Sequence, residues 1–284
     1  MRSRAWVKAS LALLALALAT TACAAEVGSS SSASPAASSA VPLPAQPTLG
    51  PFPTDLVQGL RTDVDIAYTA PTECGGTPCT VPGDVLAPAD GNDLPSVVML
   101  GGGSTPFAER RYQDALAVEL AERGAVVFLM SYRSAVTGNF DSDSYNDARC
   151  AVRYARATTE EYGGDPSRIV VVGHSQGGLL ALGIAIQPEE EADACLADGS
   201  GKPDGVVGLG SPTPSFVGAG DTAPPMWLFA GSDDRDAEGT AQRLRDRGYD
   251  AQAEELPGVT HQGITDPMAA PEVVDLIFQA VDSI

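Results

Sequence analysis

Short, continuously apolar runs alternate with helical patterns along most of this chain, and this alternation limits the possible folds more than any other feature. The runs include SVVML, AVVFLM, IVVV, GVVGL and MWLFA. Strands without polar alternation are buried on both faces, which is typical of parallel sheets covered by helices. The sequence therefore predicts an α/β fold with a mostly parallel sheet and helices on both faces, in one domain over residues 53–284.

The order of elements supports that fold class. We expect strands over Val64–Thr69, Gly83–Pro88, Ser96–Gly103, Ala125–Arg133, Ile169–Gly173, Gly205–Gly210, Met226–Gly231 and Asp250–Leu256. We expect helices over Ala108–Gly124, Tyr145–Tyr162, a segment that starts just after Ser175, Ala237–Gly248 and Pro271–Val281. The first two strands are expected to be antiparallel, and no internal repeat is visible.

A Gly-x-Ser-x-Gly pattern, GHSQG at residues 173–177, follows one of the predicted strands directly. The bare pattern is a weak signal in a glycine-rich chain, and a strand end with a chance serine would also produce it. Its place between a strand and a helix favours a nucleophile elbow, a sharp turn that raises the serine hydroxyl above the sheet. Ser175 is therefore the predicted nucleophile, and the backbone N–H of Gln176 is a predicted oxyanion donor.

A serine nucleophile needs a base within hydrogen-bond reach, and the chain has only two histidines. His174 adjoins the serine on the wrong side of the turn, so we expect it to pack structurally. His261 lies in the loop after the last predicted strand, within PGVTHQGI. We expect His261 to be the general base, the alternative being a solvent-exposed histidine.

These features resemble the α/β-hydrolase family, and in particular its esterase and dienelactone-hydrolase-like branches. The similar segments are DARCAVRYARATTEEYGGDPSRIVVVGHSQGG and PPMWLFAGSDDRDAEGTAQRLRDRGYDAQAEELPGVTH, and the resemblance covers about residues 54–284. It implies an eight-stranded type of sheet and a carboxylate between nucleophile and base in sequence. Asp234 is the expected acid, with Asp233 as the alternative, while Asp236 is expected to be a solvated loop charge.

The resemblance also implies an oxyanion hole after the third strand. Many relatives carry His-Gly-Gly-Gly there, whereas this chain reads VMLGGGS, with Leu100 or Gly101 at the histidine position. A backbone N–H is sufficient for the hole, so we expect the second donor to be Gly102 or Gly103. The alternative is a tight turn without catalytic contact.

Only about fifteen residues, SPTPSFVGAGDTAPP, separate two of the predicted strands, so a large helical lid is not expected. An open site favours soluble, short-acyl or exposed polymer esters, and Phe107 and Phe216 are candidate lining residues. The expected activity is hydrolysis of carboxylic esters through an acyl-enzyme. A serine peptidase, a polyester-degrading enzyme and a non-catalytic scaffold on the same fold are the alternatives.

The four cysteines beyond the N-terminal region predict two disulfides in an exported protein. The spacing of CGGTPC favours Cys74–Cys79, which leaves Cys150–Cys195, although four cysteines allow three pairings. Their spacing is wrong for zinc and histidines are scarce, so neither a metal nor a cofactor is expected.

The N-terminal region indicates export. Residues 1–22 contain three cationic side chains, an apolar run too short to cross a bilayer, and small residues leading to Cys23. The TTAC sequence resembles a bacterial lipobox, with Thr20 in place of the usual leucine, and implies lipidation of Cys23; ordinary cleavage nearby is the alternative. The Ser/Ala/Pro-rich residues 23–52 predict a tether between a membrane anchor and the domain.

The formal net charge of −20 would become −23 without Arg2, Arg4 and Lys8 of the leader. This acidity disfavours nucleic acid as a partner, and membrane association is expected only through the lipid anchor. The expected partner is an ester substrate, and the domain is expected to be a monomer.

Overall fold

A computed structural model of the chain describes residues 49–74, 77–103, 109–134, 142–189, 194–215 and 223–284. The chain forms two compact units, residues 1–39 and 40–284, and all described residues belong to the second. The predicted leader, Cys23 and the tether up to residue 48 lie outside the described residues. No helix in the described ranges has the length and apolar character needed to cross a membrane.

The described part of the chain contains an eight-stranded mixed sheet and a separate hairpin. The sheet strands are β1 (Leu60–Ala67), β4 (Pro82–Pro88), β5 (Leu94–Leu100), β6 (Val126–Met130), β7 (Gly164–His174), β8 (Gly205–Leu209), β9 (Met226–Gly231) and β10 (Ala251–Leu256). Their order is β1-β4-β6-β5-β7-β8-β9-β10. β4 pairs antiparallel with β1 and β6, and the other neighbours are parallel. The hairpin consists of β2 (Thr72–Cys74) and β3 (Thr77–Cys79).

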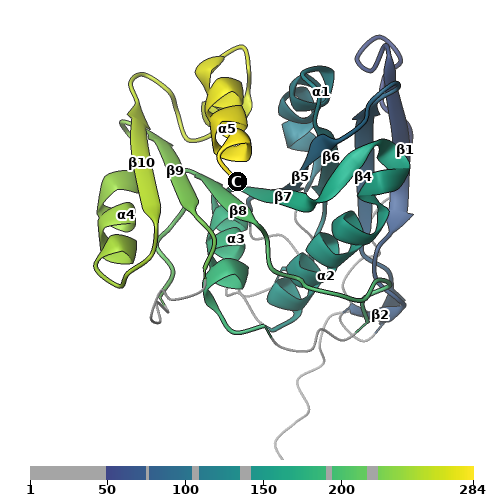
Figure 1. Cartoon of the computed structure of the whole chain (residues 1–284), viewed down its shortest axis with the longest axis horizontal. Coiled ribbons are helices and arrows are strands. Elements are labelled where there is room, and N and C mark those ends of the chain that lie inside the picture. Colours follow the sequence, from purple (N-terminus) through teal and green to yellow (C-terminus); the bar gives the residue numbers. More distant parts are fainter. Residues whose placement is uncertain (1–48, 75–76, 104–108, 135–141, 190–193, 216–222) are drawn as a thin grey trace, which may run out of the picture. The chain divides into compact units, whose positions relative to one another are not determined.

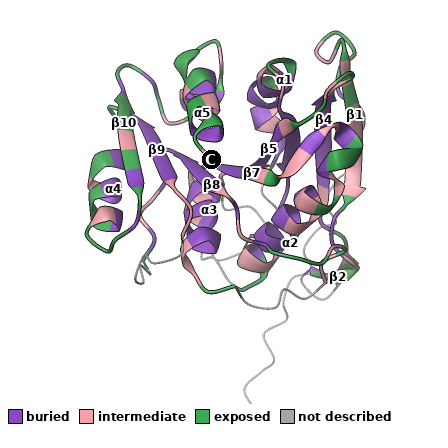
Figure 2. Ribbon diagram, viewed as in Figure 1, coloured by how far each residue is buried: buried purple, intermediate pink, exposed green. Residues whose placement is uncertain are grey.

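Helices cover both faces of the sheet, and each face has its own hydrophobic core (Figure 1). The helices are α1 (Asp114–Glu122), α2 (Ser142–Thr158), α3 (Gln176–Ile186), α4 (Ala237–Arg245) and α5 (Glu272–Asp282). α1 and α5 pack on one face, and α2, α3 and α4 on the other. Every residue of β6, β8 and β9 is buried, and Figure 2 shows the burial of the central strands. The predicted fold class is confirmed.

The register of the parallel strands brings their carboxyl ends to one edge of the sheet. Leu100 pairs with Gly173, His174 with Leu209, and Leu256 with Gly231. The loops that follow β5, β7, β8, β9 and β10 therefore leave the sheet on the same side. Residues far apart in the sequence meet there, as is usual at the carboxyl edge of such sheets.

Two helices differ from the sequence-based expectation. The helix expected over Ala108–Gly124 begins with a 3₁₀ turn at Arg111–Gln113, and its α-helical part starts only at Asp114. The guanidinium groups of Arg110 and Arg111 are held by the buried carboxylate of Asp84, which sets the chain direction at this point. The helix expected over 145–162 starts at Ser142 and ends in a 3₁₀ turn.

The folded domain starts earlier than the predicted boundary at residue 53. The Phe52 side chain is 3% exposed within the core under α1 and α5. The backbone N–H groups of Leu49 and Gly50 donate to the carboxylate of Asp65. The last residues of the predicted tether therefore belong to the domain.

Both predicted disulfides are present. Cys74 pairs with Cys79 across the β2–β3 hairpin, with their Cα atoms 5.8 Å apart. Cys150 of α2 pairs with Cys195, with their Cα atoms 4.9 Å apart and a sequence separation of 45. The second bridge joins two distant segments on one face of the sheet.

Candidate active site

Ser175 lies on the sharp turn between β7 and α3, as the motif predicts. Its φ and ψ angles are 53° and −116°, a region that L-residues rarely adopt, and its N–H donates to the carbonyl of Leu209 at 2.8 Å. Strain of this kind recurs at functional turns. A Cβ at Gly173 would overlap the Gly177 backbone across the turn, and a Cβ at Gly177 would overlap the backbone at the end of β5, so both positions require glycine.

His261 and Asp234 are in direct contact at the same edge of the sheet. The Nδ1 atom of His261 lies 2.8 Å from Oδ2 of Asp234. Because a carboxylate only accepts, Nδ1 carries the proton, and Nε2 is left as the basic nitrogen. Asp234 is 6% exposed and His261 31% exposed by side chain, so the pair is sheltered while the imidazole remains accessible.

The neighbouring aspartates have other positions. Asp236 caps the N-terminus of α4, where its Oδ1 accepts from the N–H of Gly239 at 2.7 Å. Asp233 is exposed. Of the three aspartates in this loop, Asp234 is therefore the one that reaches the imidazole.

Gly210 supports this pair and was not recognised in the sequence. It follows β8 with a φ of 55°, and a Cβ at this position would overlap Oδ2 of Asp234 and lie 2.8 Å from Nδ1 of His261. The backbone thus packs directly against the hydrogen bond between acid and base. The only sequence signal was a glycine at the end of a buried strand.

His174 is buried, as expected, but it is part of the site's hydrogen bonding. Its Nε2 lies 2.8 Å from the carbonyl oxygen of His261, and its Nδ1 lies 2.7 Å from the hydroxyl of Tyr112. Burial lowers the pKa of His174 to about 4 and raises the pKa of Tyr112 to about 12. Both side chains are therefore neutral at pH 7. Tyr112 is a further site residue that the sequence did not indicate.

The predicted oxyanion donors differ in their availability. Gln176 is the first residue of α3, where backbone N–H groups lack intrahelical partners. The N–H of Gly102 donates to the Tyr112 hydroxyl at 2.6 Å, so Gly102 is removed from the predicted hole in this arrangement. Gly103 follows with a φ of 103° and is exposed beside the cavity, which leaves it as the second candidate donor.

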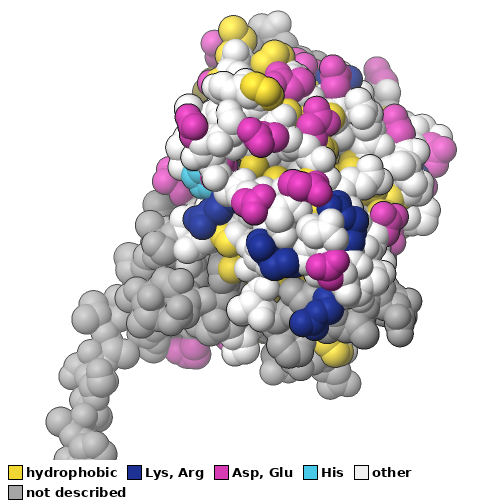
Figure 3. Space-filling view, turned by 90° about the vertical axis from the view of Figure 1, so that its left-hand side faces the viewer, with side chains coloured by type: hydrophobic (Ala, Val, Ile, Leu, Met, Phe, Trp, Pro, Cys, Tyr) yellow, Lys and Arg dark blue, Asp and Glu magenta, His cyan; other side chains and the backbone are white. Residues whose placement is uncertain are grey.

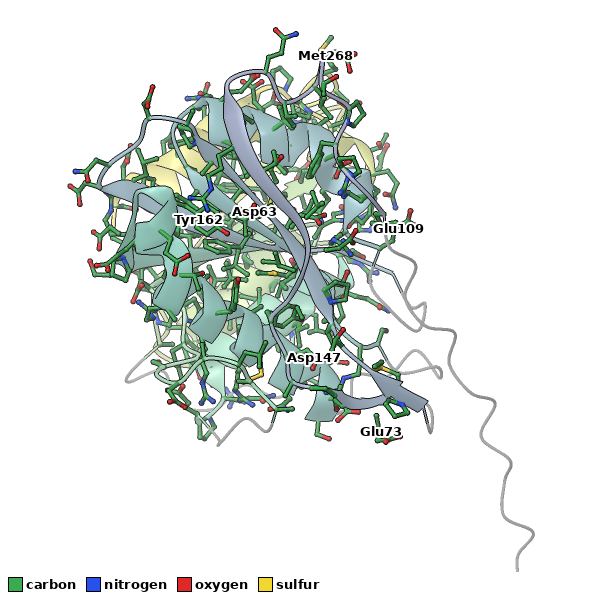
Figure 4. All side chains as sticks on the ribbon, turned by 90° about the vertical axis from the view of Figure 1, so that its right-hand side faces the viewer. Asp63, Glu73, Glu109, Asp147, Tyr162 and Met268 are labelled. Carbon is green, nitrogen blue, oxygen red and sulfur yellow. A yellow bond between two sulfur atoms is a disulfide. The ribbon has the colours of Figure 1, made fainter. Side chains whose placement is uncertain are left out.

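An open cavity of about 360 Å³ lies beside Ser175. Its lining residues are Gly102, Gly103, Glu109, Tyr112, His174, Ser175 and Gln262. Glu109, which Figure 4 labels, is the charged residue of this set and is exposed. Phe107 and Phe216, the lining residues expected from the sequence, lie outside the described residues.

A second hollow of about 250 Å³ lies at the carboxyl ends of β9 and β10 and is lined by five acidic side chains, Asp234, Asp236, Glu238, Glu254 and Glu255, together with Arg235. Acidic side chains also predominate on the face over α4 and β10 that Figure 3 shows. Within the described ranges, no group of three or more histidine, cysteine or acidic residues is arranged to hold a metal ion.

The mixed sheet, with the strained serine after β7 and the histidine–aspartate pair at the carboxyl ends of its parallel strands, has the α/β-hydrolase fold. The family described as BD-FAE matches residues 84–204. Isoprenylcysteine alpha-carbonyl methylesterase ICME of Arabidopsis thaliana is 31% identical over 99 residues, which are 34% of this chain and 23% of that protein. Human cocaine esterase is 27% identical over 107 residues, covering 35% of this chain and 19% of the esterase.

Solved structures share the fold over a larger part of the chain. An esterase from Thermogutta terrifontis, solved with propionate bound, aligns with a TM-score of 0.61 over 80% of this chain and 95% of that chain, at 19% sequence identity. At this identity the likeness shows the fold. The chain spans less than a quarter of the length of the methylesterase and of the cocaine esterase.

Proposed function

We propose that this protein is an exported serine hydrolase that cleaves carboxylic esters through an acyl-enzyme on Ser175. The observation that carries the proposal is the 2.8 Å contact between His261 and Asp234 at the edge of the sheet where Ser175 sits on a strained turn. The names of the relatives, a methylesterase and a cocaine esterase, support a carboxylic ester as the substrate.

The proposed cycle starts when Nε2 of His261 takes the proton from the Ser175 hydroxyl as its oxygen attacks the ester carbonyl carbon. Asp234 accepts from Nδ1 and stabilises the imidazolium that forms. The oxyanion of the tetrahedral intermediate is held by the N–H groups of Gln176 and Gly103. Collapse breaks the bond to the alcohol, which leaves with the proton from His261. Water, activated by the same histidine, then cleaves the acyl-serine ester.

The cavity beside Ser175 supports small or exposed esters. It is open and has a volume of about 360 Å³, close to the lower end of the usual range for ligand pockets. We therefore propose that short acyl groups are preferred to long ones. A series of 4-nitrophenyl esters from acetate to palmitate tests this proposal, and activity that rises steadily through the long chains would contradict it.

Labelling with a fluorophosphonate probe tests the catalytic proposal. The folded protein should be labelled on Ser175, as shown by peptide mapping, and Ser175→Ala should not react. Ser211→Ala is a matched control, because Ser211 is a buried serine close to α3. A folded protein that takes no label at Ser175 would contradict an enzymatic function and favour a scaffold.

Export and lipid anchoring complete the proposal. They are supported by the leader pattern before Cys23 and by the two disulfides, which persist in oxidising compartments. In a bacterial host, the full chain should be recovered with membranes, and Cys23→Ala should release it. Retention of the Cys23→Ala variant on membranes would count against lipidation.

A further inference from the structure

A chain of hydrogen bonds crosses the site and joins three loops. The N–H of Gly102 lies 2.6 Å from the Tyr112 hydroxyl, which lies 2.7 Å from Nδ1 of His174. On its other side, Nε2 of His174 lies 2.8 Å from the carbonyl oxygen of His261. The chain thus links the loop after β5, the turn after β7 and the loop after β10.

The chemistry of the end groups sets the direction of every bond in this chain. The carbonyl oxygen of His261 only accepts, so Nε2 of His174 carries the proton. Nδ1 of the neutral ring is then an acceptor, and the Tyr112 hydroxyl donates to it. The tyrosine oxygen in turn accepts from the N–H of Gly102. Each group therefore has one defined role, and no alternative set of protons satisfies all three contacts with a neutral imidazole.

Protonation states and packing keep this arrangement intact around neutral pH. Burial holds the pKa of His174 at about 4 and that of Tyr112 at about 12, so neither changes charge between about pH 5 and pH 11. The His174 ring also lies against the His261 ring, with centroids 4.7 Å apart and an interplanar angle of 39°, and meets the Tyr112 ring edge-on at 5.6 Å. The chain is thus an uncharged connection between the segments that carry the proposed reacting groups.

We propose that Tyr112 and His174 are positioning residues that hold the His261 backbone and the glycine loop after β5 at a fixed separation around Ser175. This inference rests on the proposed function, because it concerns the geometry of the proposed base and oxyanion donor. Neither side chain exchanges a proton with the substrate. Their effect is to keep the imidazole of His261 and the N–H of Gly103 in place while charge develops on the substrate.

Kinetics with 4-nitrophenyl acetate on four variants tests the proposal. His174→Ala removes both of its bonds and should lower kcat by about 10- to 100-fold, with KM changed by less than about threefold. Tyr112→Phe should lower kcat by about tenfold. Because both residues act through one chain, the double variant should be no slower than His174→Ala alone. His174→Gln keeps an N–H donor for the His261 carbonyl and should recover part of the loss.

Tyr162→Phe is the matched control. It also removes a tyrosine hydroxyl with a hydrogen bond, here to Asp63 at 2.8 Å, on the face of the molecule that Figure 4 shows, and kcat should stay within about twofold of the parent value. Should His174→Ala fail to fold, Tyr112→Phe and His174→Gln carry the test. Losses that multiply in the double variant, or a Tyr112→Phe variant as fast as the parent, would overturn the inference. A parent protein without esterase activity would overturn the proposed function as well.

Discussion

Around Ser175, the site is held by neutral groups and a single acid–base pair, whereas the segments beside β1 and β4 are held by charges. There, Arg110 and Arg111 both donate to the buried carboxylate of Asp84 at 2.7 Å, and Arg110 also donates to Asp65 at 2.6 Å. The Arg110 and Asp84 side chains are fully buried. The two regions are adjacent in sequence, because Tyr112 directly follows these arginines.

The difference indicates a division of tasks. A buried ion network fixes the start of α1 and, through it, the place of Tyr112. Around the reacting groups, the hydrogen bonds join neutral groups and the Asp234–His261 pair, and the charged side chain that lines the cavity, Glu109, is exposed. Buried ion pairs contribute little net stability but are costly to break. Such a network is therefore suited to fixing the position of a chain segment. Substitutions in the site should therefore change the reaction rate, and substitutions in the charged network should change the free energy of unfolding.

The largest expected effect is on rate alone. Ser175→Ala and His261→Ala should each reduce kcat/KM for 4-nitrophenyl acetate by about 10⁴-fold or more. The first variant lacks the proposed nucleophile, and the second lacks the base that activates it. The thermal midpoint of Ser175→Ala should change little, because alanine keeps the Cβ and the strained backbone of the turn. A fall of less than tenfold in either variant would contradict the assigned roles.

Removing a charge from the buried ion network around Asp84 should instead reduce stability. Arg110→Ala leaves Asp84 buried with part of its charge uncompensated, and we expect a loss of about 3–5 kcal/mol in the free energy of unfolding by urea. Arg123→Ala, which removes an exposed ion pair with Asp275, is the control and should cost about 0–1 kcal/mol. Equal losses of unfolding free energy in the two variants would show that the buried ion network contributes no more to stability than an exposed ion pair.

Removal of the Cys150–Cys195 disulfide should lower stability more than removal of the Cys74–Cys79 disulfide in the hairpin. Loop-closure entropy predicts that Cys150→Ser with Cys195→Ser lowers stability by about 4 kcal/mol, against about 2 kcal/mol for the Cys74–Cys79 pair. Activity at 25 °C should survive in both double variants, because neither bridge includes a residue that lines the cavity. Thermal unfolding followed by circular dichroism measures the difference, and the reverse order would contradict it.

Gly210→Ala should affect rate more than stability. The added methyl group would overlap Oδ2 of Asp234, so the acid–base pair must shift, and we expect kcat to fall by about 10- to 100-fold. Gly248 also has a positive φ, of 90°, but open space around its Cβ position, so Gly248→Ala is the control for backbone strain alone. A Gly210→Ala variant with unchanged kcat would show that the pair can move freely.

The smallest expected effect depends on pH. Burial raises the pKa of Asp114 to about 6 from an unfolded value of 3.8. Between these values the folded state binds more protons than the unfolded state, so this group lowers stability as the pH rises through that window. Asp114→Asn should therefore gain about 1 kcal/mol relative to the parent between pH 4 and pH 7, after allowance for solvent screening. A constant difference across that range would contradict the prediction.

Much of the site could be predicted because the fold limits where its parts can occur. Ser175 lies between a strand and a helix, and only one histidine other than its neighbour was available as the base. The choice of Asp234 over Asp233 depended on its offset from the end of a strand, and the 2.8 Å contact with His261 agrees with that choice. The spacing of Cys74 and Cys79 favoured the pairing that the structure shows, although four cysteines allowed three pairings.

Other features depend on contacts between distant segments. Tyr112 and His174 are 62 residues apart, and His174 and the His261 carbonyl 87 apart, so no local pattern reveals their contacts. The occupation of the Gly102 N–H by Tyr112 follows from the same packing. The sequence did not reveal the role of Asp84 either, because a single aspartate in a strand does not show which arginine will pair with it.

The sequence by itself determined the fold class and pointed to Ser175 and His261 as the proposed nucleophile and base, because apolar periodicity and motif context are local properties that burial and backbone geometry impose. Only the tertiary structure decided which aspartate meets His261, which glycine N–H stays available and what His174 does. Those outcomes depend on side-chain directions and on the separation of loops that meet at one sheet edge. Such distances are set by the packing of the whole domain and by no single segment.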